Sequence, residues 1–345
     1  MTTNILSIGQ SALAAAQVGL ATTGHNIANS GTTGYTRQVV TQGAVAGQNV
    51  GYGFVGKGTE VTGVNRAYNE FLAGQVLGAQ VSKSSLDTYY TQIRRIDNLL
   101  ADTSAGVSPA LQEFFQSVQN LAAQPNDAAS RQSMLSSSEA LAARLNGLGG
   151  QLDDIRAGIN GEIESSVSAI NAYARQIGQL NDAIEKATTA AQGRPPNDLL
   201  DQRDQLIQQL GKEVRVTVVA QGNSSHVFIG NGQPLVVGAK AYALAATNSP
   251  TDSTRTVVAY VTKDKTTILA DGALPGGRLG GLFDFRQKTL DPAQNALGRV
   301  AIALASEVNA QHRLGQTPSG TMGGNLFTVP QPLVSSSREN TGSGV

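Results

Sequence analysis

The chain has 345 residues, enough for two or three domains with cores of their own. Its 25 basic and 25 acidic residues give no net charge, which argues against a nucleic-acid surface or a polybasic membrane surface. The absence of cysteine from the sequence excludes disulfides, thiolate catalysis and cysteine-based metal sites together. Few aromatic residues and no tryptophan suit extended helical packing better than a ligand-stacking site.

Segment 1–34 predicts an almost uncharged amphipathic helix that ends abruptly in an Asn/Gly/Thr-rich turn. Large apolar residues recur along it at seven-residue intervals, with small residues three positions after them. Burying four such side chains yields about 6–12 kcal/mol, less than the cost of ordering the whole helix. We therefore predict a helix that is disordered until it polymerises. Its predicted assembly interface consists of Leu6, Leu13, Ala16, Leu20 and Ile27.

Polar residues interrupt this apolar stretch at Ser11, Gln17 and Thr22. The stretch therefore falls short of the ~18 residues of a membrane span, and no basic segment precedes it. We expect neither a cleaved secretory signal nor membrane insertion.

The remaining patterns predict a mainly α fold with an inserted β domain, in which long coiled-coil-like helices form an elongated, rod-like bundle. Region 35–211 is the predicted helical bundle, with a glycine-rich β excursion at 43–63. Region 212–275 switches to alternating strands and predicts a small antiparallel β domain, and 276–315 returns as a helix that begins after Gly281. Region 316–345 reads as the start of a further region.

Within the bundle we expect a helix from Arg66 to Leu100, and another that reaches Ala123 with Ser108 as N-cap and Pro109 at its first position. The longest apolar period runs from Ala128 to Ala190 with a stutter between Ile159 and Ile170, and its glycines predict a bend or break. The next helix is expected at 198–210, with Gly211 just past its end. The apolar positions expected to form the long helix's core are Leu145, Leu148, Leu152, Ile155, Ile159, Ile163, Val167, Ile170, Tyr173, Ile177, Leu180 and Ile184.

Three patterns that suggest chemistry have simpler interpretations. Segment 51–56 (GYGFVG) fits G-x-G-x-x-G, but no βαβ unit surrounds it, so we interpret it as a glycine-permissive turn. Asp198, Asp201 and Asp204 share one-turn spacing, a geometry for metal or acid–base chemistry, but we interpret them as solvated charges that complement the helix dipole. We predict no catalytic residue, cofactor or metal site, because the histidines His25, His226 and His312 lie in different elements.

Three separated segments carry a resemblance to a known family. The turn at 26–29 reads NIAN and is followed by TTGYTRQ at 32–38, which resembles the N-terminal signature of the bacterial flagellar axial proteins, the rod, hook and hook-associated family. Segment 276–315 is similar to the hook-associated members and not to hook or rod subunits, and segment 197–210 (NDLLDQRDQLIQQL) is a third match. The matching signature residues are Asn26, Ile27, Ala28, Asn29, Gly34, Tyr35 and Arg37.

The resemblance implies a non-enzymatic structural subunit at the hook–filament junction, outside the cell, exported through the flagellar type III channel without a cleaved signal. It implies identical subunits, the hook protein, a second junction protein and an export chaperone as partners. Such proteins pair the N-terminal helix with a C-terminal heptad helix, which is not found here, so we expect this chain to be the N-terminal part of a longer protein. The alternatives are another axial subunit of the hook or rod, or a secreted coiled-coil adhesin.

Overall fold

A computed structural model of the chain describes residues 5–100, 106–263, 265–317 and 319–331. It divides into two compact units, each assembled from separate stretches of sequence. Unit 1 comprises residues 1–83, 168–244 and 261–265, and unit 2 comprises residues 84–167, 245–260 and 266–345.

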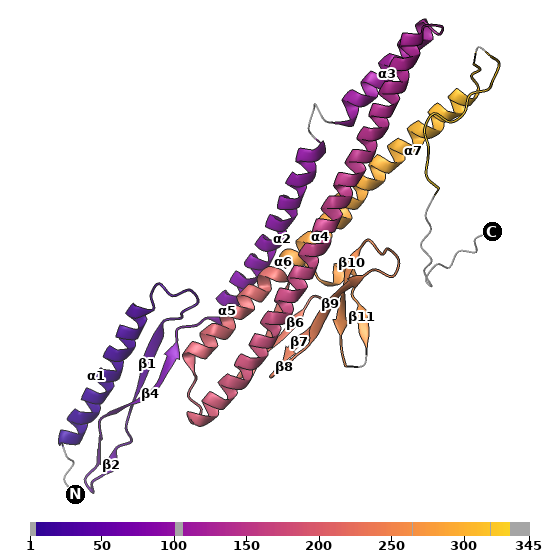
Figure 1. Ribbon diagram of the computed structural model, residues 1–345. Coiled ribbons are helices and arrows are strands. Elements are labelled where there is room, and N and C mark those ends of the chain that lie inside the picture. The colour runs from indigo at the N-terminus through magenta and orange to yellow at the C-terminus, as the bar shows by residue number, and fades with distance from the viewer. Residues whose placement is uncertain (1–4, 101–105, 264, 318, 332–345) are drawn as a thin grey trace. The chain divides into compact units, whose positions relative to one another are not determined.

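Helices dominate the described part of the chain, and the strands lie in two groups (Figure 1). The helices are α1 (Ile5–Ala28), α2 (Glu70–Leu100), α3 (Val107–Ala123), α4 (Ala128–Ala190), α5 (Asn197–Glu213), α6 (Gly277–Phe285) and α7 (Asp291–Arg313). The strands are β1 (Gln38–Ala44), β2 (Gln48–Asn49), β3 (Phe54–Val55), β4 (Thr59–Arg66), β5 (Val216–Gln221), β6 (Ser224–Ile229), β7 (Gln233–Val237), β8 (Lys240–Ala241), β9 (Ala243–Asn248), β10 (Thr256–Val261) and β11 (Thr266–Ile268). The predicted fold class, mainly α with an inserted antiparallel β region, is confirmed.

In unit 1, α1 lies along an antiparallel ribbon formed by β1 and β4 (Figure 1). The ribbon pairs Gln38 with Arg66 at one end and Ala44 with Thr59 at the other, with a bulge after Thr41. The short strands β2 and β3 pair within the loop between β1 and β4. The predicted glycine-rich β excursion therefore forms a hairpin whose long arms support the N-terminal helix.

Helix α4 runs through 63 residues, or about 95 Å at about 1.5 Å per residue. The helix is not broken at its glycines, because it continues through all of them. Most of the predicted core positions are confirmed as buried, although Leu145, Ile155, Tyr173 and Leu180 remain partly accessible. Those with at most 1% of their surface exposed are Leu148, Leu152, Ile159, Ile163, Ile170, Ile177 and Ile184.

Four expected helix ends are wrong. Helix α2 begins at Glu70, and Arg66 is the last residue of β4. Helix α3 has Gly106 as its N-cap, so Ser108 and Pro109 already lie within the first turn. Helix α6 begins at Gly277 and therefore includes Gly281. Helix α5 extends to Glu213, so Gly211 lies inside it. A Cβ at Gly211 would approach Leu77 Cδ1 to 2.5 Å. The glycine therefore packs closely against Leu77 of α2 and does not stop the helix.

The predicted β region forms two antiparallel sheets, one with the order β5-β6-β7-β8 and one with the order β11-β10-β9. In the first sheet, Val227, Ile229, Leu235 and Val236 have at most 1% of their surface exposed. Successive strands therefore form a meander around a core of branched aliphatic side chains.

Helices α6 and α7 are joined by a π-helical segment, η2 (Arg286–Leu290). In the middle of α6, the backbone of Gly281 approaches α2 closely. A Cβ added there would overlap the carbonyl oxygen of Ser85 and lie 2.9 Å from Thr88 Cβ. The packing of α6 against α2 within unit 2 thus depends on the absence of a side chain at this position.

We predict opposite effects for two glycine-to-alanine substitutions. Gly281→Ala forces α6 away from α2 and should lower the free energy of unfolding by about 1–3 kcal/mol, as overpacked sites do. Gly150→Ala in α4 meets nothing within 4 Å and should raise it by up to about 1 kcal/mol through helix propensity. Urea unfolding followed by circular dichroism measures both, and equal midpoints for the two variants would contradict the packing argument.

Candidate functional site

The Asn26 side chain links the end of α1 to the start of β1. Its Nδ2 donates to the Gln38 carbonyl oxygen at 2.9 Å, and its Oδ1 accepts the Gln38 N–H at 2.8 Å. The same Oδ1 accepts the Tyr35 hydroxyl at 2.6 Å. The amide thus pairs with Gln38 as a strand residue would, which fixes the direction in which the chain leaves the helix.

The rest of the signature turn tightens this link. The Asn29 side chain donates to the His25 carbonyl oxygen at 3.0 Å, and the Tyr35 ring meets His25 edge-on at 5.5 Å. Desolvation, and then the negative charges of Asp198 and Asp201, raise the pKa of Tyr35, so its hydroxyl keeps its proton and remains a donor.

The turn is anchored on α5 by charged groups. Asp201 Oδ2 accepts the N–H of Thr36 at 2.8 Å. Arg66, at the end of β4, donates to Asp201 Oδ1 and to Asp204 Oδ2, each at 2.7 Å. Burial alone lowers the pKa of Arg66, but the hydrogen bonds and charges of the two carboxylates outweigh it and raise that pKa. Arg66 therefore remains charged, and its two ion pairs clamp the ribbon onto α5.

The interpretation of these aspartates as solvated charges is wrong for Asp201, which is buried and ion-paired. It is also wrong for Asp204, which shares the Arg66 guanidinium. Asp198 is exposed and accepts a bond from the Gln38 side chain at 3.2 Å. Together, the three aspartates hold the signature turn and the ribbon against α5.

The other signature residues serve the same turn in different ways. Gly34 has a φ of +84°, which favours glycine, and packs against the Gln205 side chain. Arg37 contributes its carbonyl oxygen, which accepts the Ala67 N–H at 2.7 Å, and its side chain is exposed. Ile27 and Ala28 are exposed on the last turn of α1.

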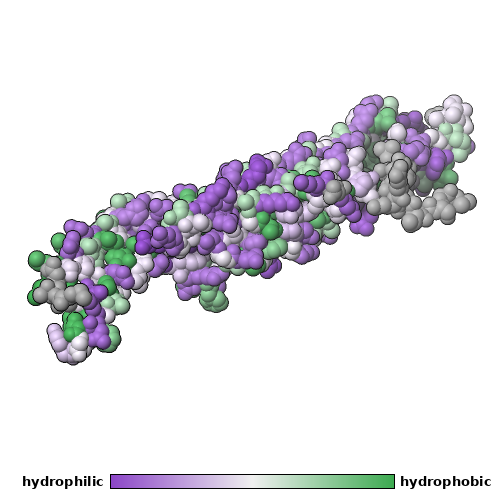
Figure 2. All heavy atoms as spheres, turned by 90° about the horizontal axis from the view of Figure 1, so that it is seen from below, coloured by the Kyte–Doolittle hydropathy of each residue, from purple (hydrophilic) through white to green (hydrophobic). Residues whose placement is uncertain are grey.

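The predicted assembly row occupies the outer face of α1. Leu6, Leu13, Leu20 and Ile27 are 61–79% exposed, and Ala16 beside them is exposed too. In Figure 2, hydrophobic residues reach the surface at the left of the view, where the N-terminal part of the chain lies. These side chains form a continuous apolar row that the described residues leave largely uncovered.

The inner face of α1 packs on its own ribbon. Ala15 is 3% exposed, and Ser11 Oγ accepts the Thr59 N–H at 3.2 Å. The less exposed positions of α1 include small or polar residues, Ser11, Ala15 and Asn26, together with Ile8 and Val18. The large apolar side chains of the outer row remain mostly exposed.

We expected the apolar stretch of α1 to fall short of a membrane span, and its length and composition show that this is wrong. Helix α1 is long and apolar enough to cross a membrane, a weak indication that signal sequences share. One face of α1 carries the polar residues Ser11 and Asn26, and both are hydrogen-bonded to the ribbon.

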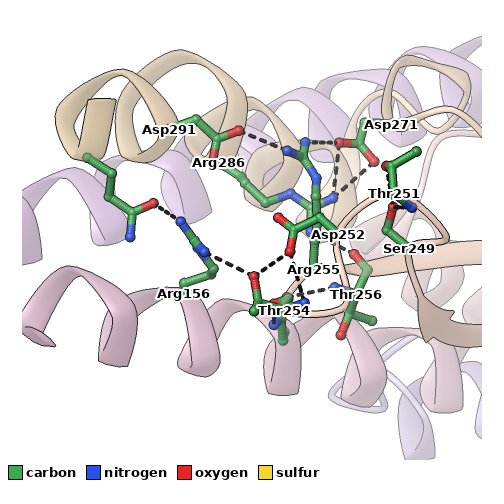
Figure 3. A network of polar contacts seen from close by, with 12 residues as sticks. Arg156, Ser249, Thr251, Asp252, Thr254, Arg255, Thr256, Asp271, Arg286 and Asp291 are labelled. Atoms are coloured by element: carbon green, nitrogen blue, oxygen red, sulfur yellow. Dashed lines mark hydrogen bonds and ion pairs between the residues drawn. The ribbon is translucent and has the colours of Figure 1, made fainter. Parts of the chain in front are cut away.

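A second polar cluster lies in unit 2, around Arg286 (Figure 3). This side chain is 1% exposed, donates to the Thr256 carbonyl oxygen at 2.6 Å, and binds both oxygens of Asp271 at 3.0 Å. Arg255 bridges Asp271, at 2.8 Å, to Asp291, at 3.0 Å. Burial lowers the pKa of Arg286, and the Asp271 charge opposes this effect. Two cations and two anions thus tie β10 to the π-helical segment.

The sequence analysis missed Arg66, Arg255 and Arg286 as structural anchors. Each finds its carboxylate partners on elements that sequence patterns do not bring together. For Arg286, a signal was present: the arginine follows GLFDF at 281–285, a segment that is apolar apart from Asp284, and a buried charge is costly unless it is paired.

The other candidate sites have structural positions. The G-x-G-x-x-G segment forms a turn with φ of +91° at Gly51 and +149° at Gly53, which confirms the glycine-permissive interpretation. His312 hydrogen-bonds the Gly324 carbonyl oxygen at 2.7 Å, and His226 lies on β6. Within the described part of the chain, no three His, Asp or Glu side chains converge as metal ligands would.

Two family models match this chain, one at its N-terminus and one over most of its length. Residues 6–36 match the flagella basal body rod protein family, so the N-terminal helix and its turn are of the flagellar axial type. Residues 93–327 match the flagellar hook-associated protein FlgK helical domain. The chain belongs to the FlgK family of flagellar hook-associated proteins, which confirms the resemblance carried by the NIAN turn and by segment 276–315.

Curated relatives and a solved structure agree with this assignment. The chain is 42% identical to flagellar hook-associated protein 1 of Salmonella typhimurium over 98% of its own length and 61% of the relative's. It is 38% identical to the Escherichia coli K12 protein of the same name, over 98% and 62% of the two lengths. The flagellar hook junction protein FlgK from Burkholderia pseudomallei superposes with a TM-score of 0.73 at 39% identity, covering 78% of this chain and 49% of that one. The chain thus spans about three-fifths of the length of these curated relatives.

We predict that Asn26→Ala loosens the signature turn. The Gln38 N–H and carbonyl lose their partner, so the local free energy of opening should fall by about 1–3 kcal/mol. Hydrogen exchange at the Gln38 amide measures this change. Asn29→Ala, which removes side-chain bonds to His25 and Thr32 but none to Gln38, is the matched control, and unchanged Gln38 protection in Asn26→Ala would overturn the assignment.

We predict that Arg286→Met destabilises unit 2 by about 3–5 kcal/mol, because Asp271 then loses a buried partner. The control is Lys288→Met, two residues along, which removes an exposed ion pair with Asp284 and should leave the unfolding midpoint close to that of the unmodified protein. Urea titrations of both variants give the comparison. Midpoints for the two that agree within error would rule out Arg286 as an anchor.

Proposed function

We propose that this protein is a structural subunit of the bacterial flagellum at the hook–filament junction, and that it polymerises through α1 and through lateral contacts of its helical elements. The observation that carries the proposal is the row Leu6, Leu13, Leu20 and Ile27, exposed on a helix whose other face is packed and bonded. Covering four such side chains yields about 6–12 kcal/mol. Family membership supports a flagellar role, and the names of the relatives support the junction.

The same proposal covers partners and location. The α1 row and the helical region would contact three partners: identical subunits, the hook protein and a second junction protein. A chaperone would accompany the C-terminal part during export through the type III channel, without a cleaved signal. The protein would act outside the cell by geometry, and not by catalysis.

Within the flagellum, the match of residues 93–327 to a hook-associated helical domain favours the junction over the hook and the rod. The match of residues 6–36 to the rod-protein family supports a terminal helix of the kind shared by axial proteins. The two matches together fit a subunit that joins two parts of one axis.

The test places charges on the row. Leu13→Asp with Leu20→Asp, introduced into the full-length protein, should abolish incorporation, because two buried carboxylates without partners cannot be tolerated at the interface. Electron microscopy with antibody labelling at the distal end of the hook, together with swimming assays, measures incorporation. Circular dichroism should show an unchanged unfolding midpoint, since both positions are exposed.

Ala14→Asp with Ala21→Asp is the matched control. It adds the same charge to the same helix at exposed positions about 100° around from the row, and should preserve incorporation. Normal motility and labelling in the leucine double variant would refute the proposed function. An antibody signal spread over the cell surface, with no band at the hook, would favour the adhesin instead.

A further inference from the structure

Strand β5 (Val216–Gln221) forms one edge of the sheet β5-β6-β7-β8, and among the described strands it pairs with β6 alone. The two strands are joined by a two-residue loop, Gly222 and Asn223, in which Gly222 has a φ of +59°. This is the geometry of a tight hairpin. In such a hairpin, alternate residues of β5 turn their N–H and C=O toward β6, and the others turn theirs away from it.

The hydrogen bond from the Gly230 N–H to the Arg215 carbonyl oxygen, at 3.2 Å, sets the phase of this alternation. Odd-numbered residues of β5 bond to β6, and even-numbered residues turn their backbone groups outward. The outward residues are Val216, Val218 and Ala220. In the part of the chain that the structure describes, no donor or acceptor pairs with their outward groups.

Most of β5 is open to solvent. Thr217, Val219, Ala220 and Gln221 are exposed, and Val219 has 49% of its surface accessible. Segment 216–225 contains no Asp, Glu, Lys, Arg or Pro, and the pairing of β5 with β6 has no bulge. The strand therefore lacks the charges, prolines and bulges by which edge strands avoid pairing with another chain.

Other strands of this β region carry such protection or have their backbone groups paired. The N–H and C=O of Leu244, in edge strand β9, both pair with the Asn171 side chain at 2.8 Å. Those of Ser225, at the start of β6, pair with the Asn181 side chain at 3.2 and 2.9 Å. Edge strand β8 has only two residues and begins with Lys240. Strand β5 differs from these in keeping a row of unpaired backbone groups.

The chemistry of this edge selects the kind of partner. Donors and acceptors that alternate along an extended, uncharged strand are matched by the backbone of another extended chain. A helix has already bonded its backbone groups internally, and a lipid tail has none to offer. Nucleic-acid phosphates require cations, and segment 216–225 contains neither Lys nor Arg.

We infer that β5 binds an extended, uncharged segment of a partner polypeptide as an additional antiparallel strand. The added strand bonds to the outward backbone groups of Val216, Val218 and Ala220 and extends the sheet by one strand. Its side chains pack beside Val218 on one face of the sheet and beside Val219 on the other. The inference goes beyond the proposed function, because it names a contact surface outside α1 and uses none of the residues of the α1 row.

Hydrogen exchange in the full chain tests the geometry of the edge. The amides of Thr217 and Val219 are bonded to β6 and should exchange at least about tenfold more slowly than those of Val218 and Ala220. Equal exchange rates at the odd and even positions would contradict the outward assignment and remove the inference.

A capped peptide, acetyl-TVTVTVT-amide, serves as the probe for the partner strand. Its addition to the full chain should slow exchange at Val218 and Ala220 to a rate near that of Val219. A fluorescein-labelled copy should show saturable binding by anisotropy. Binding without protection at Val218 and Ala220, or no binding up to about 1 mM peptide, would overturn the inference.

Val218→Pro blocks the edge, because proline removes the outward N–H and leaves the hydrogen bonds to β6 in place. It should weaken peptide binding by about tenfold or more. Val219→Thr is the matched control, because it keeps every backbone group and an exposed β-branched side chain, and it should bind as the unmodified protein does. Equal peptide affinity in the two variants would refute the role of the edge.

Unfolding midpoints show whether the proline acts only on the edge. Val218→Pro should unfold close to the unmodified protein. If its midpoint falls, Ala220→Pro replaces it, since Ala220 lies nearer the end of the hairpin, is exposed and has an outward N–H too. Peptide affinity in Ala220→Pro equal to that of Val219→Thr would then refute the role of the edge.

Sedimentation of the full chain without peptide tests whether a second copy occupies the edge instead. A β5 edge that remains unprotected at the highest concentration supports a different polypeptide as the partner. Dimers that protect Val218 and dissociate in Val218→Pro would overturn that choice. None of these measurements involves the α1 row, so their failure leaves the proposed function standing, and failure of the α1 variants to block incorporation leaves this inference untouched.

Discussion

The amide of Asn26 makes the contact on which the arrangement of the N-terminal part depends. A helix end leaves carbonyl groups unpaired, and the first residue of a strand has a backbone that needs partners. Asn26 meets the second need from inside the last turn of α1, by pairing with both backbone groups of Gln38. Helix and strand are thereby joined at a fixed angle. Asp201 of α5 accepts hydrogen bonds from the Thr36 N–H and the Arg66 side chain, and these bonds hold the joined helix and strand against α5.

This joint lets one helix serve two purposes. Ser11 and Ala15 help to attach α1 to its ribbon, while Leu13, Leu20 and Ile27 remain 61–74% exposed on the outer face. A helix held only by its large side chains would have to give up its own packing to assemble. Here the packing within the molecule and the proposed packing between molecules use different faces, so assembly does not require α1 to rotate.

Sequence reasoning succeeded where a pattern is local and repetitive. The alternating three- and four-residue spacing that includes Leu148, Leu152 and Ile159 predicted buried positions because helical geometry alone decides which residues share a face. The same argument placed Leu6, Leu13 and Leu20 on one face of α1. It failed where a distant residue decides: Gly211 fits Leu77 of α2, and Asp201 pairs with Arg66, 135 positions away. The aspartates of α5 were therefore interpreted as solvated charges that complement the helix dipole, since Arg66 is far from them in the sequence.

Segment η2 has a further consequence. A π-helical turn accommodates one residue more than the regular helix would in the same place, so it has the form of an absorbed single-residue insertion. Every residue of α7 therefore lies one position later than it would on a regular helix continued from α6. Removal of a residue between Arg286 and Leu290 would restore a regular path and turn the whole of α7 by about 100°. Alignments with relatives should therefore place a length difference here only where the buried arginine has changed as well.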